Sequence, residues 1–234
     1  MKKLIVLNHK TFMEYEDVIN YIKDVKDKIR TDIEVVICPS TVFIPYFSGK
    51  YNFLLGSQNI SHKDITGEVT AKELKSLGVK YSIVGHNERR DNLNETEKLI
   101  NEKIKVSLKN NIIPIICLGE TKEEYLRNKT GEVIVRQLKE YLKNISVSYD
   151  TVFAYEPNYK NDDIKNIKEI EEVITLIKNI IIKAFNINPI VLYGGNVNLN
   201  TIKELNKIKN LDGYLIGKES TNVKNIVKLL NSVE

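Results

Sequence analysis

Short runs of apolar, mostly β-branched residues recur along the whole chain and predict buried β-strands. Because these runs are continuously apolar and do not alternate with polar residues, they are typical of a parallel sheet that is buried on both faces. The predicted strands are Leu4–Leu7, Glu34–Cys38, Phe53–Gly56, Tyr81–Val84, Ile112–Cys117, Thr151–Tyr155, Ile190–Tyr193 and Leu211–Ile216.

The segments between the predicted strands carry apolar residues at helical spacing. From Val18 to Ile29, the apolar positions are separated by 4, 3 and 4 residues, which places them on one face of a helix. Similar stripes run through Ile134–Ile145, Ile167–Ile177 and Val223–Leu230. These segments are therefore predicted to be amphipathic helices.

Eight strands that are each followed by a helix, at roughly 29 residues per unit, predict a (β/α)8 barrel. We expect this barrel to be a single domain over residues 1–234. The alternative is an open doubly wound sheet, which usually has a glycine-rich turn after its first strand. Here the first strand is followed by Asn8-His9-Lys10, so the pattern favours the barrel.

Composition and charge exclude several other classes of protein. The chain is 42% hydrophobic and has a net charge of only +4, so it is neither a disordered chain nor a strongly basic one. No apolar run approaches the roughly 20 residues that a membrane helix needs. Cys38 and Cys117 form neither a disulfide framework nor a metal-binding spacing. We expect a cytoplasmic protein that binds neither nucleic acid nor membranes.

Polar residues gather where the predicted strands end, which is where (β/α)8 barrels place their active sites. A carboxylate, an imidazole, an ammonium group and two glycine turns should meet at this end. Together they suggest proton transfer beside an anion. These residues are Asn8 and Lys10; Gln58 and Asn59; His86, Asn87, Glu88, Arg89 and Arg90; Cys117 and Glu120; Glu156; Gly194, Gly195 and Asn196; Gly217 and Lys218.

Glu156 and His86 are the candidates for proton transfer. Pro157 favours extended backbone at Glu156, so this carboxylate could project from a strand end as a general base. His86 could donate a hydrogen bond to a carbonyl oxygen as it becomes an enediolate. The alternatives are a solvated glutamate before a turn and a structural histidine. We interpret His9 as structural and Cys117 as a packed thiol.

The remaining candidates would bind and orient an anion. Lys10 could neutralise a phosphate or a developing oxyanion, and Asn8 could hold substrate hydroxyl groups or cap a turn. Glu88 could orient Lys10 or His86, or form an ion pair at a helix start. Backbone N–H groups of Gly194-Gly195 and Gly217, together with a last helix beginning at Ser220 or Thr221, predict a phosphate site. The alternatives are two ordinary turns for the glycines and, because the chain is rich in lysine, a Lys10 that has no role in binding.

In their order along the chain, these motifs resemble the triosephosphate isomerase family. The resemblance extends from residue 4 to about residue 220. The matching motifs are Asn8 and Lys10; Thr66-Gly67-Glu68; Gly85-His86-Asn87-Glu88-Arg89-Arg90; Glu95 and Lys103; Cys117-Leu118-Gly119-Glu120-Thr121; Lys129-Thr130; Gln137-Leu138; Ala154-Tyr155-Glu156-Pro157; and Tyr193-Gly194-Gly195.

The resemblance implies interconversion of dihydroxyacetone phosphate and D-glyceraldehyde 3-phosphate, a step of glycolysis and gluconeogenesis. Glu156 would move the proton between C1 and C2, neutral His86 would polarise the carbonyl, Lys10 would supply positive charge and Asn8 would orient the substrate. A Glu base beside a neutral His is the known arrangement of this family. The resemblance implies no metal or cofactor. It also implies a homodimer, in which Thr66-Gly67-Glu68 reaches the partner's active site.

The chain departs from the family pattern in its lid and its phosphate turns. The family's lid has a Val-Trp hinge and a Gly-Thr-Gly stretch, whereas this chain reads Asn158-Tyr159-Lys160-Asn161-Asp162-Asp163-Ile164. This segment has no glycine, is about two residues shorter, and places two carboxylates near the expected phosphate. Asn196 replaces the usual Ser, Lys218 replaces a second Gly, His9 replaces an aromatic residue and Asn87 replaces a Ser.

Three functions are compatible with these residues. The first is a triosephosphate isomerase with a divergent lid. The second is an isomerase of a related sugar phosphate, such as a four-carbon ketose phosphate, which would account for the altered lid and turns. The third is a non-catalytic homologue that binds a ligand or a partner. Retention of Asn8, Lys10, His86 and Glu156 together argues against the third.

Overall fold

The structure is a computed structural model that describes residues 2–49, 51–158 and 166–234. Within these residues, eight parallel strands form a closed barrel in the order β1 to β8, and β8 pairs with β1. The strands are β1 (Leu4–Asn8), β2 (Glu34–Cys38), β3 (Leu54–Ser57), β4 (Tyr81–Val84), β5 (Ile113–Leu118), β6 (Val152–Tyr155), β7 (Ile190–Tyr193) and β8 (Gly213–Ile216). The predicted (β/α)8 barrel is confirmed.

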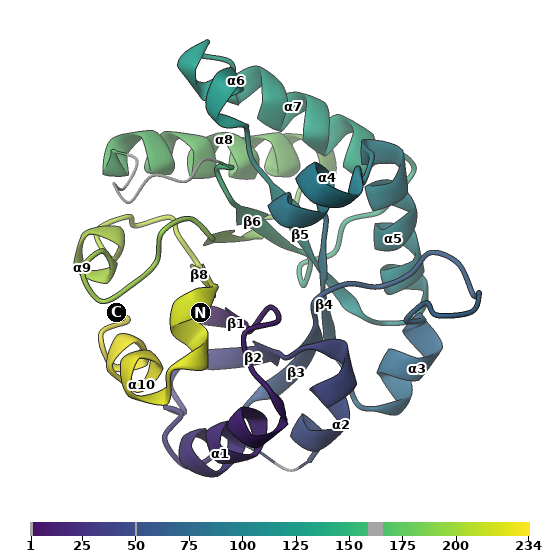
Figure 1. Cartoon of the computed structure of the whole chain (residues 1–234). Coiled ribbons are helices and arrows are strands. Elements are labelled where there is room, and N and C mark those ends of the chain that lie inside the picture. Colours follow the sequence, from purple (N-terminus) through teal and green to yellow (C-terminus); the bar gives the residue numbers. More distant parts are fainter. Residues whose placement is uncertain (1, 50, 159–165) are drawn as a thin grey trace.

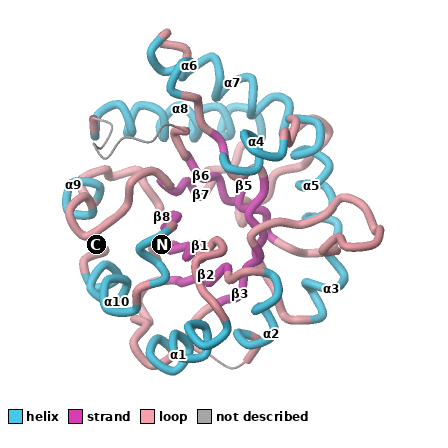
Figure 2. Tube along the Cα trace, in the orientation of Figure 1, coloured by secondary structure: helices cyan, strands magenta, loops and turns pink. Residues whose placement is uncertain are grey.

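Helices surround the barrel on its outside (Figures 1 and 2). They are α1 (Tyr15–Val25), α2 (Ile44–Phe47), α3 (Ala71–Ser76), α4 (Asn87–Leu93), α5 (Glu97–Lys109), α6 (Lys122–Leu126), α7 (Thr130–Tyr141), α8 (Ile167–Phe185), α9 (Ile202–Leu205) and α10 (Val223–Asn231), with 3-10 turns η1 (Thr41–Phe43) and η2 (Lys218–Thr221). None of the described helices is long and apolar enough to cross a membrane.

The strands coincide with the predicted apolar runs, and the largest difference is at β8. This strand begins at Gly213 and not at Leu211. Asp212 lies in the preceding loop, where its carboxylate accepts the backbone N–H of Val191 at 2.8 Å. The backbone of Asp212 also bonds to Val191 and Leu4, so its side chain adds a contact to β7 just before β8 begins.

The last helix also begins later than predicted. Ser220 and Thr221 lie in η2, and α10 begins at Val223 with Asn222 as its N-cap. The Ser220 hydroxyl is turned inward and donates to the backbone oxygen of Asn8 at 3.2 Å. This bond links the ends of β8 and β1 and holds Ser220 outside the helix. The prediction that Ser220 or Thr221 starts the last helix is wrong, because α10 begins at Val223.

Two apolar layers explain why the strand sequences are continuously apolar. Alternate residues such as Val6, Ile83 and Leu215 fill the inside of the barrel. Their neighbours, such as Ile5 and Leu7, pack against the surrounding helices. Because both faces are buried, polar side chains are confined to the strand ends, where the candidate site residues lie.

Candidate active site

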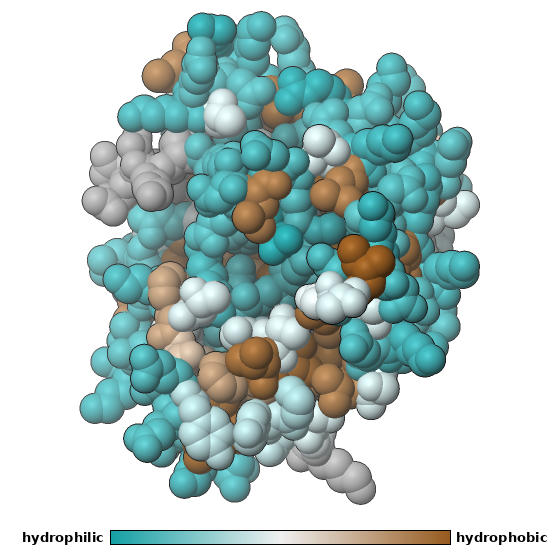
Figure 3. Space-filling model, turned by 45° about the vertical axis from the view of Figure 1, so that its right-hand side comes forward, coloured by the Kyte–Doolittle hydropathy of each residue, from teal (hydrophilic) through white to brown (hydrophobic). Residues whose placement is uncertain are grey.

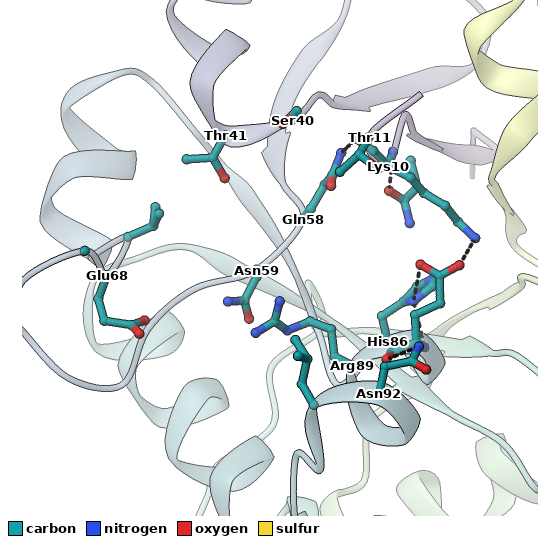
Figure 4. Close-up of a pocket in the computed structure, with 15 residues that line it drawn as sticks. Lys10, Thr11, Ser40, Thr41, Gln58, Asn59, Glu68, His86, Arg89 and Asn92 are labelled. Carbon is teal, nitrogen blue, oxygen red and sulfur yellow. Dashed lines mark hydrogen bonds and ion pairs between the residues drawn. The ribbon is translucent and has the colours of Figure 1, made fainter. Parts of the chain in front are cut away.

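The ends of five strands and the turns that follow them enclose a cavity of about 280 Å³. The residues expected to act on a substrate line it: Asn8, Lys10, His86, Glu156, Gly194, Gly195, Asn196, Gly217 and Lys218. Glu88 lines a neighbouring cavity of about 530 Å³, which shares Asn8, Lys10 and His86 with the first (Figure 4). The barrel thus brings together residues from β1, β4, β6, β7 and β8.

Glu156 follows β6 directly and is only 3% exposed. Its backbone N–H donates to the oxygen of Leu118 at 2.8 Å, and the glycines that directly follow β5 and β7 leave room for it. A Cβ at Gly119 would lie 2.0 Å from the Glu156 backbone oxygen, and one at Gly194 would lie 2.6 Å from Glu156 Cγ. Carboxylate oxygen Oε2 has no hydrogen-bond partner among the described residues. A buried acceptor in a polar cavity is suited to take a proton from a ligand.

His86 is the N-cap of α4 and faces Glu156. Its Nδ1 accepts the backbone N–H of Glu88 at 3.2 Å, a donor shared with Asn87 Oδ1 at 2.6 Å. Because Nδ1 acts as an acceptor, we place the ring hydrogen of the neutral imidazole on Nε2. Nε2 lies 3.4 Å from Glu156 Oε1. A hydrogen-bond donor and a carboxylate acceptor therefore face the same small volume.

Lys10 is held in a left-handed backbone conformation, with φ of +50°. Such a conformation costs a non-glycine residue about 1 kcal/mol or more. Asn8 Oδ1 accepts the Lys10 N–H at 3.1 Å, and Gln58 Nε2 donates to the Lys10 oxygen at 2.7 Å and to the Cys38 oxygen at 3.0 Å. The sequence did not reveal this contribution of Gln58, because the two backbone oxygens that it contacts lie 48 and 20 residues away along the chain.

The Lys10 ammonium forms an ion pair with Glu88, with 2.6 Å between Nζ and Oε1. Figure 4 shows Lys10, Gln58 and His86 around the same cavity. Glu88 therefore contacts both sequence-predicted partners, Lys10 through its carboxylate and His86 through its backbone N–H. These contacts fit both interpretations of Glu88, a residue that orients Lys10 or His86 and an ion pair at a helix start.

The first residue of the divergent lid is joined to two parts of the barrel. The Asn158 N–H donates to the Glu120 oxygen at 2.7 Å, and its side-chain amide donates to the Asp91 carboxylate on α4. The other residues of the segment that departs from the family's lid pattern, 159–164, lie outside the described residues. Among the described residues, no group of three or more His, Cys, Asp or Glu side chains is arranged to hold a metal ion.

Cys117 and His9 are buried groups with structural surroundings. Burial, and then the nearby Glu156 carboxylate, raises the pKa of the Cys117 thiol, which keeps it protonated. His9 is 1% exposed and packs edge-on against Tyr21, with 4.6 Å between ring centroids. Neither ring nitrogen of His9 has a partner among the described residues, and burial lowers the pKa of His9 to about 3.

The buried His9 should make stability fall as the solution is acidified. Its pKa is about 6.5 in the unfolded chain and about 3 in the folded one. Between these values the unfolded state binds more protons, so stability decreases as pH falls below about 6.5. Between pH 7 and pH 5, wild type should lose about 2 kcal/mol more free energy of unfolding than His9→Phe. Urea unfolding at both pH values measures this difference; equal losses would contradict it.

The fold defines a class of protein, the (β/α)8-barrel enzymes, and the carboxylate and the imidazole face each other where this class places its active sites. Within this class, a family model described as triosephosphate isomerase matches residues 3–233. The chain belongs to the triosephosphate isomerase family.

Individual relatives agree with this assignment. The chain is 36% identical to a triosephosphate isomerase of Mycoplasmopsis pulmonis, over 98% of each chain. It is 34% identical to one of Mycoplasma mobile, over 98% of this chain and 99% of the relative. A crystal structure of the Bartonella henselae triosephosphate isomerase superposes with a TM-score of 0.90 at 26% identity, covering 99% of both chains.

Proposed function

We propose that the protein interconverts dihydroxyacetone phosphate and D-glyceraldehyde 3-phosphate in the 280 Å³ cavity that Glu156 and His86 line. The chain is an intramolecular aldose–ketose isomerase of the triosephosphate isomerase family. The observation that carries the proposed mechanism is the 3.4 Å separation between His86 Nε2 and Glu156 Oε1, in the cavity that Lys10 also lines. A substrate carbonyl and its neighbouring C–H bond can contact both groups at once.

Glu156 acts as the general base. Its carboxylate takes the proton from C2 of the aldose, and the C–H electron pair forms the C1–C2 double bond of an enediolate. The Nε2–H group of His86 hydrogen-bonds to the oxygen that gains negative charge, and the Lys10 ammonium stabilises the same charge. The hydroxyl proton on O2 passes to O1, O2 becomes the carbonyl oxygen, and Glu156 returns a proton to C1, which gives the ketose. In the reverse direction the same groups act in the opposite order.

The phosphate group lies at the turns after β7 and β8. We assign its contacts to the backbone N–H groups of Gly194, Gly195 and Gly217, and to the side chains of Asn196 and Lys218. Because all five residues line the 280 Å³ cavity with Glu156, a short chain of carbons joins the phosphate to the reacting atoms. This favours a small phosphorylated sugar as the substrate.

The Lys218 ammonium should strengthen binding of the phosphate dianion. We expect Lys218→Gly to raise the inhibition constant of inorganic phosphate about 3- to 10-fold, with the largest effect at low salt because charge interactions are screened. Lys224→Ala is the matched control, since it removes the same charge from an exposed position on α10. An unchanged inhibition constant in Lys218→Gly would place this ammonium in solvent.

The proposed function is tested by measuring turnover of triose phosphates and of a four-carbon ketose phosphate with the purified protein. We expect turnover of the triose phosphates in the usual enzyme range of about 1–1,000 per second, and a lower kcat/KM for the longer sugar. A higher kcat/KM for the longer sugar would support the related isomerase instead. If wild type turns over neither substrate faster than Glu156→Gln does, the result would support the non-catalytic homologue.

We also propose that the chain forms a homodimer through the loop that contains Thr66-Gly67-Glu68. This loop extends outward between β3 and α3 (Figure 1). Gly67 and Glu68 line the 530 Å³ cavity, which opens beside Lys10 and His86. A cavity of this size, adjoining the catalytic cavity, could receive the corresponding loop of a second copy. The cytoplasmic location likewise remains a prediction.

Apolar side chains near this cavity support the proposed interface. Exposed Phe12 and Val42 each follow a residue that lines it, and Leu93 lines it directly. Figure 3 shows hydrophobic side chains spread among polar ones on this side of the molecule. A second copy seated on this side would bury the apolar surface of these exposed side chains, which favours association.

Sedimentation should show a dimer at micromolar concentration, and Ile65→Asp should shift it to the monomer. Ile65 is 59% exposed and adjoins Thr66, so a carboxylate there would be buried without a partner in the interface. Leu126→Asp is the matched control, because Leu126 is 68% exposed on α6. A monomeric wild type, or equal dissociation of both variants, would contradict this interface.

A further inference from the structure

A hydrogen-bond network in the turn after β7 fixes the orientation of the Asn198 side chain. Its Oδ1 accepts the backbone N–H groups of Asn200 at 2.8 Å and Thr201 at 3.2 Å. An amide oxygen has two acceptor positions, and these two bonds use both of them. Asn198 therefore presents its NH2 group to its remaining neighbour, Asn196, with 2.7 Å between Nδ2 and Oδ1.

The orientation of Asn198 determines the orientation of Asn196. Because Asn198 donates, the Asn196 atom that faces it is the oxygen, and the Asn196 NH2 group lies on the other branch of the side chain. Asn196 lines the 280 Å³ cavity together with Gly195 and Lys218. We propose that Asn198 is a positioning residue of the phosphate site, which turns the Asn196 amide so that N–H donors face the substrate phosphate. This inference rests on the proposed function.

Such positioning matters for asparagine because an amide has a donor end and an acceptor end. A serine hydroxyl rotates and can always turn its hydrogen toward an anion, whereas a flipped amide presents an oxygen. An oxygen facing a phosphate dianion replaces an attraction by a repulsion. An asparagine in this position therefore needs a neighbour that selects one of its two orientations.

The backbone of the same turn has separate support. Thr201 Oγ1 accepts the Asn198 N–H at 2.9 Å and donates to the Asn196 backbone oxygen at 2.8 Å. These contacts hold the main chain without touching the amide pair between Asn196 and Asn198. A variant at Thr201 can therefore separate loosening of the turn from loss of the amide orientation.

The test is Asn198→Asp, with binding of inorganic phosphate measured by calorimetry at high salt. An aspartate can accept the same two backbone N–H groups but cannot donate to Asn196, so the Asn196 amide should flip. We expect phosphate binding to weaken about 10-fold, with charge repulsion reduced by screening. In an Asn196→Ser background, the same change should weaken binding by no more than about 3-fold, because a hydroxyl can rotate.

Two further measurements exclude a general loss of structure. Thr201→Val should weaken phosphate binding less than Asn198→Asp does. Turnover of unphosphorylated D-glyceraldehyde should fall by a smaller factor than turnover of its phosphate ester, since only the ester uses the site. If Asn198→Asp denatures the protein, Asn198→Ala in the same double-mutant comparison replaces it.

Several results would overturn the inference. One is that Asn198→Asp weakens phosphate binding equally in the wild-type and Asn196→Ser backgrounds. The others are that Asn198→Asp leaves the phosphate affinity unchanged, or that wild type does not bind phosphate. Failure of the proposed function gives a different result: wild type binds phosphate with the expected dependence on Asn198 but does not interconvert the triose phosphates.

Discussion

Glu156→Gln should lower kcat by about 10³-fold or more, with a much smaller change in KM. Glutamine has nearly the same shape as glutamate, but its amide cannot take a proton from carbon. General-base catalysis by a positioned side chain contributes about 10²- to 10⁴-fold. Because Glu156 is buried and fits closely against Gly119 and Gly194, few other bases can take its place. Steady-state kinetics in both directions measures the effect.

Glu156→Asp is the matched comparison for this prediction. It keeps a carboxylate but withdraws it from the ligand by one methylene group, so its activity should lie between those of wild type and Glu156→Gln. A kcat of Glu156→Gln within a few-fold of wild type would show that another residue is the base. Equal losses in both variants would indicate that shape at this position matters more than proton transfer.

His86→Asn should lower kcat by about 10²- to 10³-fold, the range found when a hydrogen-bond donor to a developing oxyanion is removed. Asparagine is a good N-cap, so it can still accept the Glu88 N–H that His86 Nδ1 accepts at 3.2 Å. Its shorter side chain cannot place a donor where His86 Nε2 lies. The variant therefore separates the cap from the catalytic hydrogen bond.

Thermal unfolding provides the control for His86→Asn. An unfolding temperature close to that of wild type, together with the loss of kcat, would assign the effect to the missing donor. A kcat within a few-fold of wild type would contradict the role of His86. A large loss of stability would mean that the substitution had disturbed α4.

The barrel could be predicted from the sequence because its strands are buried on both faces. Every residue of β4, from Tyr81 to Val84, is buried, and such continuous runs stand out along the chain. Short helices were harder to predict, because α2 and α9 have only four residues each. The start of α10 at Val223 also depended on a tertiary contact, the bond from Ser220 to Asn8.

That the candidate residues lie together could be predicted, because they come within a few residues of the ends of predicted strands. Glu156 and His86 are examples, and both line the 280 Å³ cavity; their catalytic roles stay predictions. Gln58 and Asn198 have effects that the sequence could not reveal. Gln58 bonds to the backbone of Lys10 and Cys38, and Asn198 selects the orientation of Asn196. Such roles depend on which atoms meet in three dimensions.

The proposed function depends above all on proton transfer by Glu156 through an enediolate of a triose phosphate. This step is examined by converting D-glyceraldehyde 3-phosphate in deuterium oxide and locating deuterium in the product by NMR. We predict dihydroxyacetone phosphate that carries solvent deuterium at C1, formed by wild type and not by Glu156→Gln. Product formed equally fast by Glu156→Gln would contradict this mechanism.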